Sequence, residues 1–285
     1  MTRVTMADVA RAAGVNKGTV SRALRGDKRI SNETRERVWQ IAKELGYEPD
    51  AVASGLSSRR TGVVAIVVER MSRPWTGTFL AAAAGVLSRF KLEVLLFEAD
   101  SPARTRASIV RRIESRKADG LIWAGEQPLG EASFDIPVVR VGAGLDGANF
   151  RVGIDREWTA ELVRSLCQKK NAVYRGGEDS AFPFLADLAG GGEKKDTFAI
   201  WDGCCASGER PALVCGDERL AAAMSVPCLR FPARELGVLA ARLLTNAIRG
   251  CGVRPVAVLA RPPLVSASGE PVLPKSVQMR EKGVQ

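Results

Sequence analysis

The sequence contains no histidine, and this absence excludes several kinds of chemistry. Neither a mixed Cys/His zinc site nor catalysis by an imidazole base can be built from it. The sequence also lacks a Gly-x-Ser-x-Gly elbow and a phosphate-binding loop, and no paired arrangement of cysteines or carboxylates points to a catalytic centre. We therefore predict that the protein is not an enzyme and that it uses no metal or cofactor.

Long apolar runs are also missing. No stretch approaches the roughly 18 residues that a membrane span requires. The N-terminus carries charge at Arg3 and Asp8 and has no apolar core of a secretory signal. These features predict a cytoplasmic protein without a membrane partner.

The six cysteines are too few and too irregularly spaced for a disulfide framework in a chain of 285 residues. We expect reduced thiols. The adjacent pair Cys204 and Cys205 lacks the spacing of a tetrahedral metal clip, but a redox or soft-metal sensing role stays open beside an incidental loop pair.

Positive charge is in excess, and it is concentrated at one end. The chain carries a net charge of +10, and residues 1–60 hold 12 Lys or Arg against 7 Asp or Glu. Such clustering is the electrostatic footprint of a nucleic-acid-binding segment. The hydrophobic content of 46% is enough for two or three packed units.

The stretch from Asp8 to Arg25 has the pattern of a helix-turn-helix. Two short apolar stripes meet at Gly14, which supplies the turn, and their members are Val9, Ala10 and Ala13 in the first helix and Val20, Ala23 and Leu24 in the second. Asn16 is suited to cap the second helix. An ordinary amphipathic helical pair with solvated charges is the alternative interpretation.

Two further helix caps are predicted, one before the helix-turn-helix and one after it. Thr5 and Asp8 have the spacing of a capping box. Ser31 is suited to cap a third helix that runs to about Leu45, with an apolar stripe on Val38, Ile41, Ala42 and Leu45. Three helices with facing stripes predict one small domain.

Beyond residue 60, strand and helix patterns alternate, which favours a parallel sheet covered by helices. VVAIVV at 63–68 and EVLLF at 93–97 flank a helix whose stripe is Phe79, Ala83, Val86, Leu87 and Phe90. Further strands are predicted at 119–125, in IPVVRVG and in FRVGID, and a helix at 156–167. This pattern alone predicts only an α/β domain.

The segment from residue 4 to residue 56 closely resembles the headpiece and hinge of the lactose-repressor/galactose-repressor family of transcription factors. The elements that carry the resemblance are GV-x-x-x-TVSR-x-L, SNETRERV and LGY-x-P. It implies a two-lobed α/β core like that of periplasmic binding proteins, with parallel sheets flanked by helices, behind a small all-α helix-turn-helix domain. The implied divisions are a headpiece (1–47), a hinge helix or linker (48–61), a core (62–270) and a polar tail (271–285).

The resemblance also implies which residues contact DNA. Lys17, Gly18 and Arg22 would face base edges in the major groove. Phosphate contact or orientation of the headpiece would come from Thr5, Asn16, Thr19, Ser21, Ser31, Asn32 and Thr34. Because Gly18 has no side chain, we predict that Lys17 and Arg22 carry the direct readout.

In the implied hinge, Ala53 and Leu56 would lie against DNA, with Leu56 as a wedge between base steps of the minor groove. A flexible linker is the alternative. Gly55 supports the alternative, because glycine costs about 1 kcal/mol in a helix interior.

The second lobe departs from the family pattern. It looks shortened by several tens of residues relative to other family members, which is a large change for a domain, since domains usually have about 50–250 residues. Ser180 has a counterpart in the family, but the arginine that usually follows and holds the ligand has none, and Pro183 is expected to disturb a helix. Trp75, Asp155 and Asp217 match ligand-facing positions. Alternatively, Trp75 fills the interface between the lobes, and the two aspartates cap helices.

These features together predict a dimeric transcriptional regulator, a repressor of a near-palindromic operator on double-stranded DNA, controlled by a sugar or nucleoside effector. Within that class, a constitutive or redox-triggered regulator whose core serves dimerisation only stays open. From another class, a cytoplasmic sugar-binding protein is the alternative. The tail has no heptad pattern that would predict an oligomer beyond the dimer.

Overall fold

The computed structural model describes residues 4–24, 26–47, 60–99, 103–125, 134–142, 150–168, 170–176, 180–188, 197–202, 210–251, 254 and 256–272. The chain divides into two compact units, Met1–Thr61 and Gly62–Gln285. The first unit spans the predicted headpiece and hinge, and the second spans the predicted core and tail.

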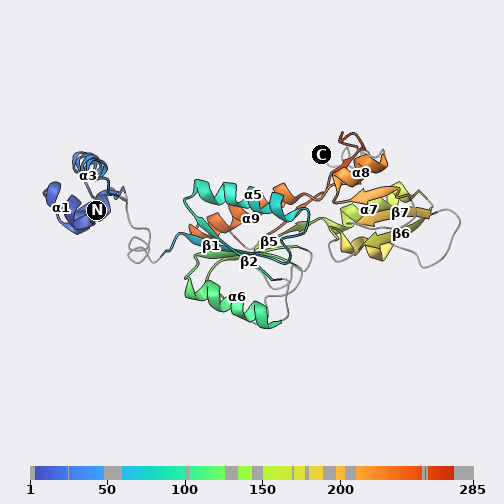
Figure 1. The fold of residues 1–285 in the computed structure, drawn as a ribbon, viewed down its shortest axis with the longest axis horizontal. Helices are drawn as coiled ribbons and strands as arrows, with labels where there is room; N and C mark the ends of the chain where they lie inside the picture. Colours follow the sequence, from blue (N-terminus) through green and yellow to red (C-terminus); the bar gives the residue numbers. More distant parts are fainter. Residues whose placement is uncertain are drawn as a thin grey trace. The chain divides into compact units, whose positions relative to one another are not determined.

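The headpiece contains the three expected helices, α1 (Met6–Ala12), α2 (Lys17–Leu24) and α3 (Asn32–Glu44) (Figure 1). Their facing stripes form one cluster of buried side chains, Val9, Ala10, Ala13, Val20, Ala23, Val38 and Ala42. Gly14 makes the turn between α1 and α2 with a φ of +64°. The predicted stripe of α3 was wrong at Leu45, which follows the last helical residue and is 39% exposed.

The first lobe of the core is built on a parallel six-stranded sheet with the order β10-β5-β4-β3-β1-β2. Its strands are β1 (Val63–Val68), β2 (Glu93–Glu98), β3 (Gly120–Ala124), β4 (Val138–Val141), β5 (Phe150–Ile154) and β10 (Val256–Ala260). The helices α5 (Thr76–Arg89) and α9 (Ala233–Ile248) lie side by side on one face, and α6 (Ala103–Ser115) covers the other (Figure 1).

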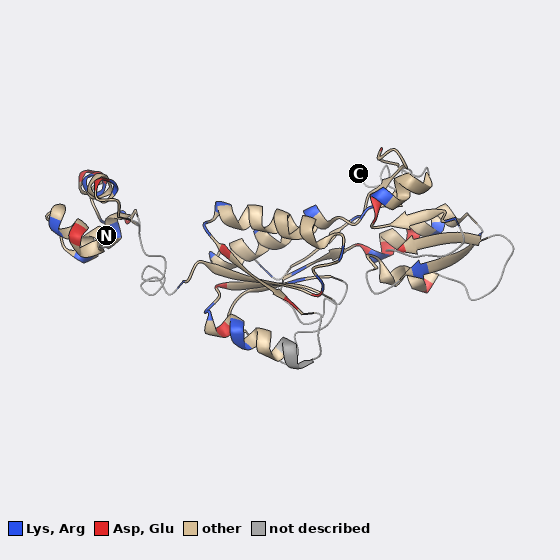
Figure 2. Ribbon diagram, viewed as in Figure 1, with Lys and Arg blue, Asp and Glu red and all other residues tan. Residues whose placement is uncertain are grey.

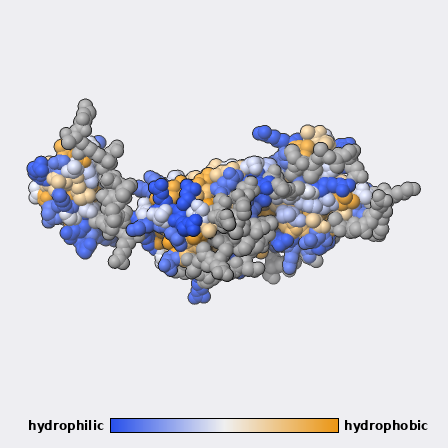
Figure 3. All heavy atoms as spheres, turned by 60° about the horizontal axis from the view of Figure 1, so that its bottom comes forward, coloured by the Kyte–Doolittle hydropathy of each residue, from blue (hydrophilic) through white to orange (hydrophobic). Residues whose placement is uncertain are grey.

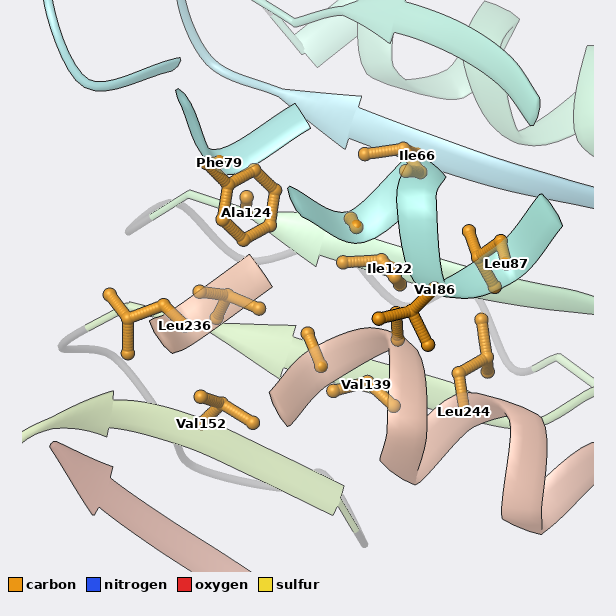
Figure 4. Packing of buried hydrophobic residues seen from close by; sticks show 14 of the residues in the cluster. Ile66, Phe79, Val86, Leu87, Ile122, Ala124, Val139, Val152, Leu236 and Leu244 are labelled. Carbon is orange, nitrogen blue, oxygen red and sulfur yellow. The ribbon is translucent and has the colours of Figure 1, made fainter. Parts of the chain in front are cut away.

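The main core of this lobe lies between the sheet and the pair α5 and α9 (Figure 4). Ile66, Ile122 and Val139 from the strands meet Phe79 and Leu87 of α5, and all five are fully buried. Gly237 of α9 lets the two helices come close, because a Cβ there would lie 2.5 Å from the Phe79 carbonyl oxygen.

The predicted stripe of α5 was wrong at its last member. Phe90 follows the final helical residue and is 42% exposed. The Arg249 guanidinium lies over its ring at 5.5 Å from the centroid. The ring therefore packs against a cation near the surface and not in the core.

The second lobe has a smaller, five-stranded sheet with the order β11-β9-β8-β7-β6. The strands β6 (Asn171–Gly176), β7 (Thr197–Asp202), β8 (Leu213–Cys215) and β9 (Cys228–Leu229) are parallel, and β11 (Leu264–Val265) pairs antiparallel. The helix α7 (Arg156–Cys167) and the 3-10 helix η1 (Pro183–Leu188) pack on one face, and α8 (Glu218–Met224) packs on the other.

Pro183 begins η1, so the predicted disturbance takes the form of a short 3-10 helix at this place.

The two lobes also differ in the position of their first strand. In the first lobe β1 lies between β2 and β3, whereas β6 is the last strand of its sheet. The shortening of the second lobe stays a prediction.

The chain passes between the lobes three times. It leaves the first sheet after β5, returns after β9 to form α9 and β10, and enters the second sheet again at β11. The helix α9 thus covers the first sheet although it directly follows β9 of the second sheet.

In the parts of the chain that the structure describes, no helix is long and apolar enough to cross a membrane. Hydrophilic residues cover much of the visible surface, with hydrophobic areas between them (Figure 3). Among the exposed large hydrophobic residues, Leu96 and Leu259 lie on opposite edge strands of the first sheet.

Candidate nucleic-acid interface and ligand pocket

The start of α2 is fixed by Asn16. Its Oδ1 accepts a hydrogen bond from the Thr19 N–H at 2.8 Å and one from the Thr19 hydroxyl at 3.1 Å. The predicted N-cap is thus confirmed. It places Lys17 and Gly18, both exposed, in the first turn of the helix.

Gly18 shapes the surface of α2 although it has no side chain of its own. The Arg22 Nε donates to the Gly18 carbonyl oxygen at 3.1 Å. A Cβ on Gly18 would lie 3.2 Å from the Asn16 Oδ1 and 3.4 Å from the Arg22 Nη2. The glycine therefore leaves room for the Arg22 guanidinium to lie along the helix, a role that sequence reasoning missed.

An open hollow of about 470 Å³ adjoins this surface and is lined by Gly18, Ser21, Arg22, Asp27 and Arg29. The Arg29 Nη2 bonds the Asp27 Oδ2 at 2.7 Å. Hydrogen bonds from Arg29 lower the pKa of Asp27 to about 2, so the carboxylate stays charged. Lys and Arg residues occur along the helices of the headpiece (Figure 2).

The remaining predicted DNA contacts sit at helix starts. The Asp8 Oδ2 accepts from the Thr5 backbone N–H at 3.0 Å, as a capping box requires. Ser31 caps α3 by accepting from the Thr34 N–H at 3.3 Å. Asn32 accepts a hydrogen bond from Arg35. The contacts of these residues with DNA stay predictions, and Ala53 and Leu56 lie outside the described residues.

A pocket lies where the carboxyl ends of the first sheet's strands meet the second lobe. Its free volume is about 50 Å³, and its lining is Arg73, Trp75, Gly125, Val141, Gly142, Gly153, Ile154, Arg156, Ser180, Ala181, Pro183, Phe184, Phe231 and Leu236. The sequence-predicted Trp75 and Ser180 are both part of it.

Trp75 lines the pocket and also packs between elements, and its contact with a ligand stays a prediction. Its ring stacks on Phe231 with centroids 4.7 Å apart and meets the edge of Phe79 at 6.3 Å. The indole Nε1 is buried and has no acceptor among the described residues.

Neither predicted aspartate lines the pocket. Asp155 caps α7, since its Oδ1 accepts from the Trp158 N–H at 3.1 Å, and its Oδ2 pairs with Arg261 at 3.2 Å. Asp217 caps α8 through the N–H groups of Arg219 and Leu220, both at 3.0 Å. The alternative helix-capping role is what the structure shows, and ligand contact stays a prediction that these bonds do not support.

Two arginines of the pocket were missed. Arg73 pairs with Glu69 at 3.2 Å and lies 5.9 Å from the Trp75 ring centroid. Arg156, the first residue of α7, lies over the Phe184 ring at 4.8 Å. The family resemblance places a ligand-holding arginine after Ser180, whereas Arg73 precedes α5 and Arg156 begins α7.

Beneath the pocket wall lies a buried carboxylate, Asp202, at the end of β7. It accepts from the Ala181 and Phe182 N–H groups, both at 2.6 Å, and from the Tyr174 hydroxyl at 2.8 Å. Burial raises the pKa of Asp202 to about 6, against these favourable hydrogen bonds. Asp202 thus anchors the segment that carries Ser180 and Ala181.

Three described cysteines, Cys167, Cys215 and Cys228, are buried, whereas Cys251 is exposed. Cys215 is fully buried, and burial raises its thiol pKa well above the usual value. Burial raises the pKa of Cys228 to about 12. Buried thiols of this kind react slowly. Cys204 and Cys205 lie outside the described residues, and the described residues contain no cluster suited to a metal ion.

The headpiece matches a known family. Residues 5–50 fit the bacterial regulatory proteins of the lacI family. Catabolite control protein A of Staphylococcus xylosus is 31% identical over 186 residues, which cover 62% of this chain and 56% of that protein. The HTH-type transcriptional regulator pepR1 of Lactobacillus delbrueckii subsp. lactis is 30% identical over 188 residues, with the same coverage. The chain thus spans about half the length of these relatives, and neither is named as an enzyme.

Solved structures share the fold at lower identity. A lacI-family transcriptional regulator from Silicibacter pomeroyi has a TM-score of 0.67 at 20% identity and covers 92% of this chain and 98% of its own. The lac repressor dimer bound to operator and the anti-inducer ONPF has a TM-score of 0.72 at 17% identity. The match covers 93% of this chain and 98% of that chain. The predicted fold class is confirmed. The chain therefore carries the helix-turn-helix domain of the lacI family of bacterial regulatory proteins, followed by a core with the two-lobed fold of the lac repressor.

Proposed function

We propose that this protein is a sequence-specific transcriptional repressor that acts in the cytoplasm without a catalytic step. The observation that carries the proposal is the surface of α2, where Asn16 fixes the helix start and Gly18 leaves Arg22 room beside exposed Lys17. A short helix with a cationic, polar outer face suits the major groove. The sugar-binding alternative gives this surface no role.

The repressor acts as a homodimer on a near-palindromic operator. One headpiece reads only a few base pairs, so two copies related by a twofold axis need two matching half-sites. The lac repressor of similar fold is a dimer bound to operator, which supports this part of the proposal. An effector in the core pocket controls the dimer, and the buried indole N–H of Trp75 without an acceptor favours this over a constitutive form.

Selection of bound sites from random DNA tests the proposal, with a near-palindrome as the expected result. On the selected site, Arg22→Ala should lower discrimination against single base changes by about 1–3 kcal/mol, roughly 5- to 150-fold, because a guanidinium contact to a base edge is lost. Binding constants for a panel of variant sites at fixed salt measure this.

Lys43→Ala is the matched control, since it also removes one exposed cation but lies in the last turn of α3. It should leave the ranking of sites unchanged. An unchanged ranking with Arg22→Ala would remove that residue from the readout, and selection of no site would overturn the proposed function.

Affinity should also fall steeply with salt. Residues 1–60 hold 12 Lys or Arg, doubled in a dimer, and those that neutralise phosphates displace condensed counterions from DNA. A protein with six to ten phosphate contacts loses about 10³- to 10⁵-fold in affinity between 50 and 200 mM salt. Titrations of the selected site across that range measure the slope, and an affinity insensitive to salt would contradict phosphate contact by these cations.

A further inference from the structure

The core pocket has a distinctive combination of a flat apolar slot and cationic groups. Three glycines, Gly125, Gly142 and Gly153, line it at strand ends and present backbone where side chains would otherwise stand. The rings of Trp75, Phe184 and Phe231 supply apolar lining. Flat backbone and aromatic rings together suit a planar ligand.

The pocket carries positive charge beyond what its own carboxylate neutralises. Arg73 is paired with Glu69, and both side chains are largely buried. Arg156 makes its cation-π contact with Phe184, and within the described ranges no carboxylate pairs with it. Arg156 is exposed, and a ligand with one negative charge could pair with its guanidinium at the edge of the pocket.

One residue of the pocket lining, Trp75, also carries a buried neutral donor. The Trp75 Nε1 is buried without an acceptor, although indole N–H groups usually find one when buried. The indole can donate but cannot accept. An acceptor on the ligand, such as a carboxylate oxygen, would satisfy it.

We infer that the effector is a small planar carboxylate, an aromatic acid rather than a neutral sugar or nucleoside. The inference rests on the proposed effector control of a repressor. The free volume of about 50 Å³ favours a single ring over a larger ligand. The carboxylate binds Arg156 and the Trp75 N–H, while the ring lies between the aromatic side chains and the glycine backbone.

Titration calorimetry of the full chain tests this with benzoate and 4-hydroxybenzoate, against benzamide, galactose and adenosine. We expect the two carboxylates to bind and benzamide, which has the same ring without the charge, to bind at least about tenfold more weakly. Benzamide binding as tightly as benzoate, binding of galactose or adenosine alone, or no binding of either carboxylate would each overturn the inference.

Variants assign the contacts. Arg156→Gln should weaken benzoate binding about tenfold or more, and Trp75→Phe, which keeps a ring but removes the N–H, by about two- to tenfold. Arg261→Gln is the control, because Arg261 pairs with Asp155 and stacks on Trp158 outside the pocket lining. Benzoate binding unaffected by Arg156→Gln would overturn the inference.

A mobility-shift assay on the selected DNA site separates this result from the proposed function. If benzoate binds but no DNA site is selected, the repressor proposal fails and the ligand class stands. If the DNA site binds and aromatic acids do not, the ligand class fails and the DNA-binding function stands.

Discussion

Replacing Gly237 by alanine will destabilise the core by about 1–3 kcal/mol or more, because the added methyl group overpacks a close helix contact. The new Cβ would lie 2.5 Å from the Phe79 carbonyl oxygen and 3.2 Å from the Ala83 backbone nitrogen. Both are backbone atoms of α5, so no side-chain rotation relieves the clash. The helices α5 and α9 must move apart, which opens the largest cluster of buried residues.

Gly85→Ala provides the matched control, because this glycine lies in α5 and a Cβ there would meet nothing within 4 Å. Alanine is favoured over glycine in a helix by about 1 kcal/mol, so this variant should be as stable as the parent or more stable. Denaturant unfolding of the full chain, followed by tryptophan fluorescence, compares the two. Equal stability of both variants would show that α5 and α9 do not approach closely at Gly237.

The second large effect concerns pH and Asp202. Burial raises the pKa of this carboxyl group in the folded core from 3.8 to about 6. A raised pKa in the folded state gives stability that is fully present below pH 4 and is lost as the pH rises through 6. The shift corresponds to a loss on the order of 3 kcal/mol across this window.

Asp202→Asn should flatten this dependence, because an amide does not titrate. Melting temperatures between pH 4 and pH 7 measure the slope. Asp187→Asn, the same substitution at an exposed position of η1, should keep the slope of the parent. A slope that persists in Asp202→Asn would show that another group causes it.

The headpiece could be predicted in detail because its determinants are local. Asn16, Ser31 and Gly14 act within a few residues of their own position, through caps and a turn that depend only on residue type and spacing. The errors at Leu45 and Phe90 have one cause. In both cases the apolar spacing continues one residue past the end of the helix, where the chain turns away from the core.

The pocket was less predictable because its residues come from distant parts of the chain. Trp75, Arg156 and Phe231 meet only after two sheets have formed and the chain has passed between them. Asp155 and Asp217 show the opposite case. Each follows a strand and precedes a helix, a position that suits a ligand contact and a helix cap equally well from sequence alone.

The repeated passage of the chain between the lobes has a consequence for synthesis on the ribosome. The first sheet has five of its strands by Ile154, but α9, which covers one face beside α5, starts only at Ala233, and β10 follows at Val256. Until those residues leave the exit tunnel, apolar residues such as Ile122 and Val139 lack part of their cover. The headpiece, whose contacts are all local, folds early, whereas the first lobe waits for the end of translation and needs protection from aggregation in that interval.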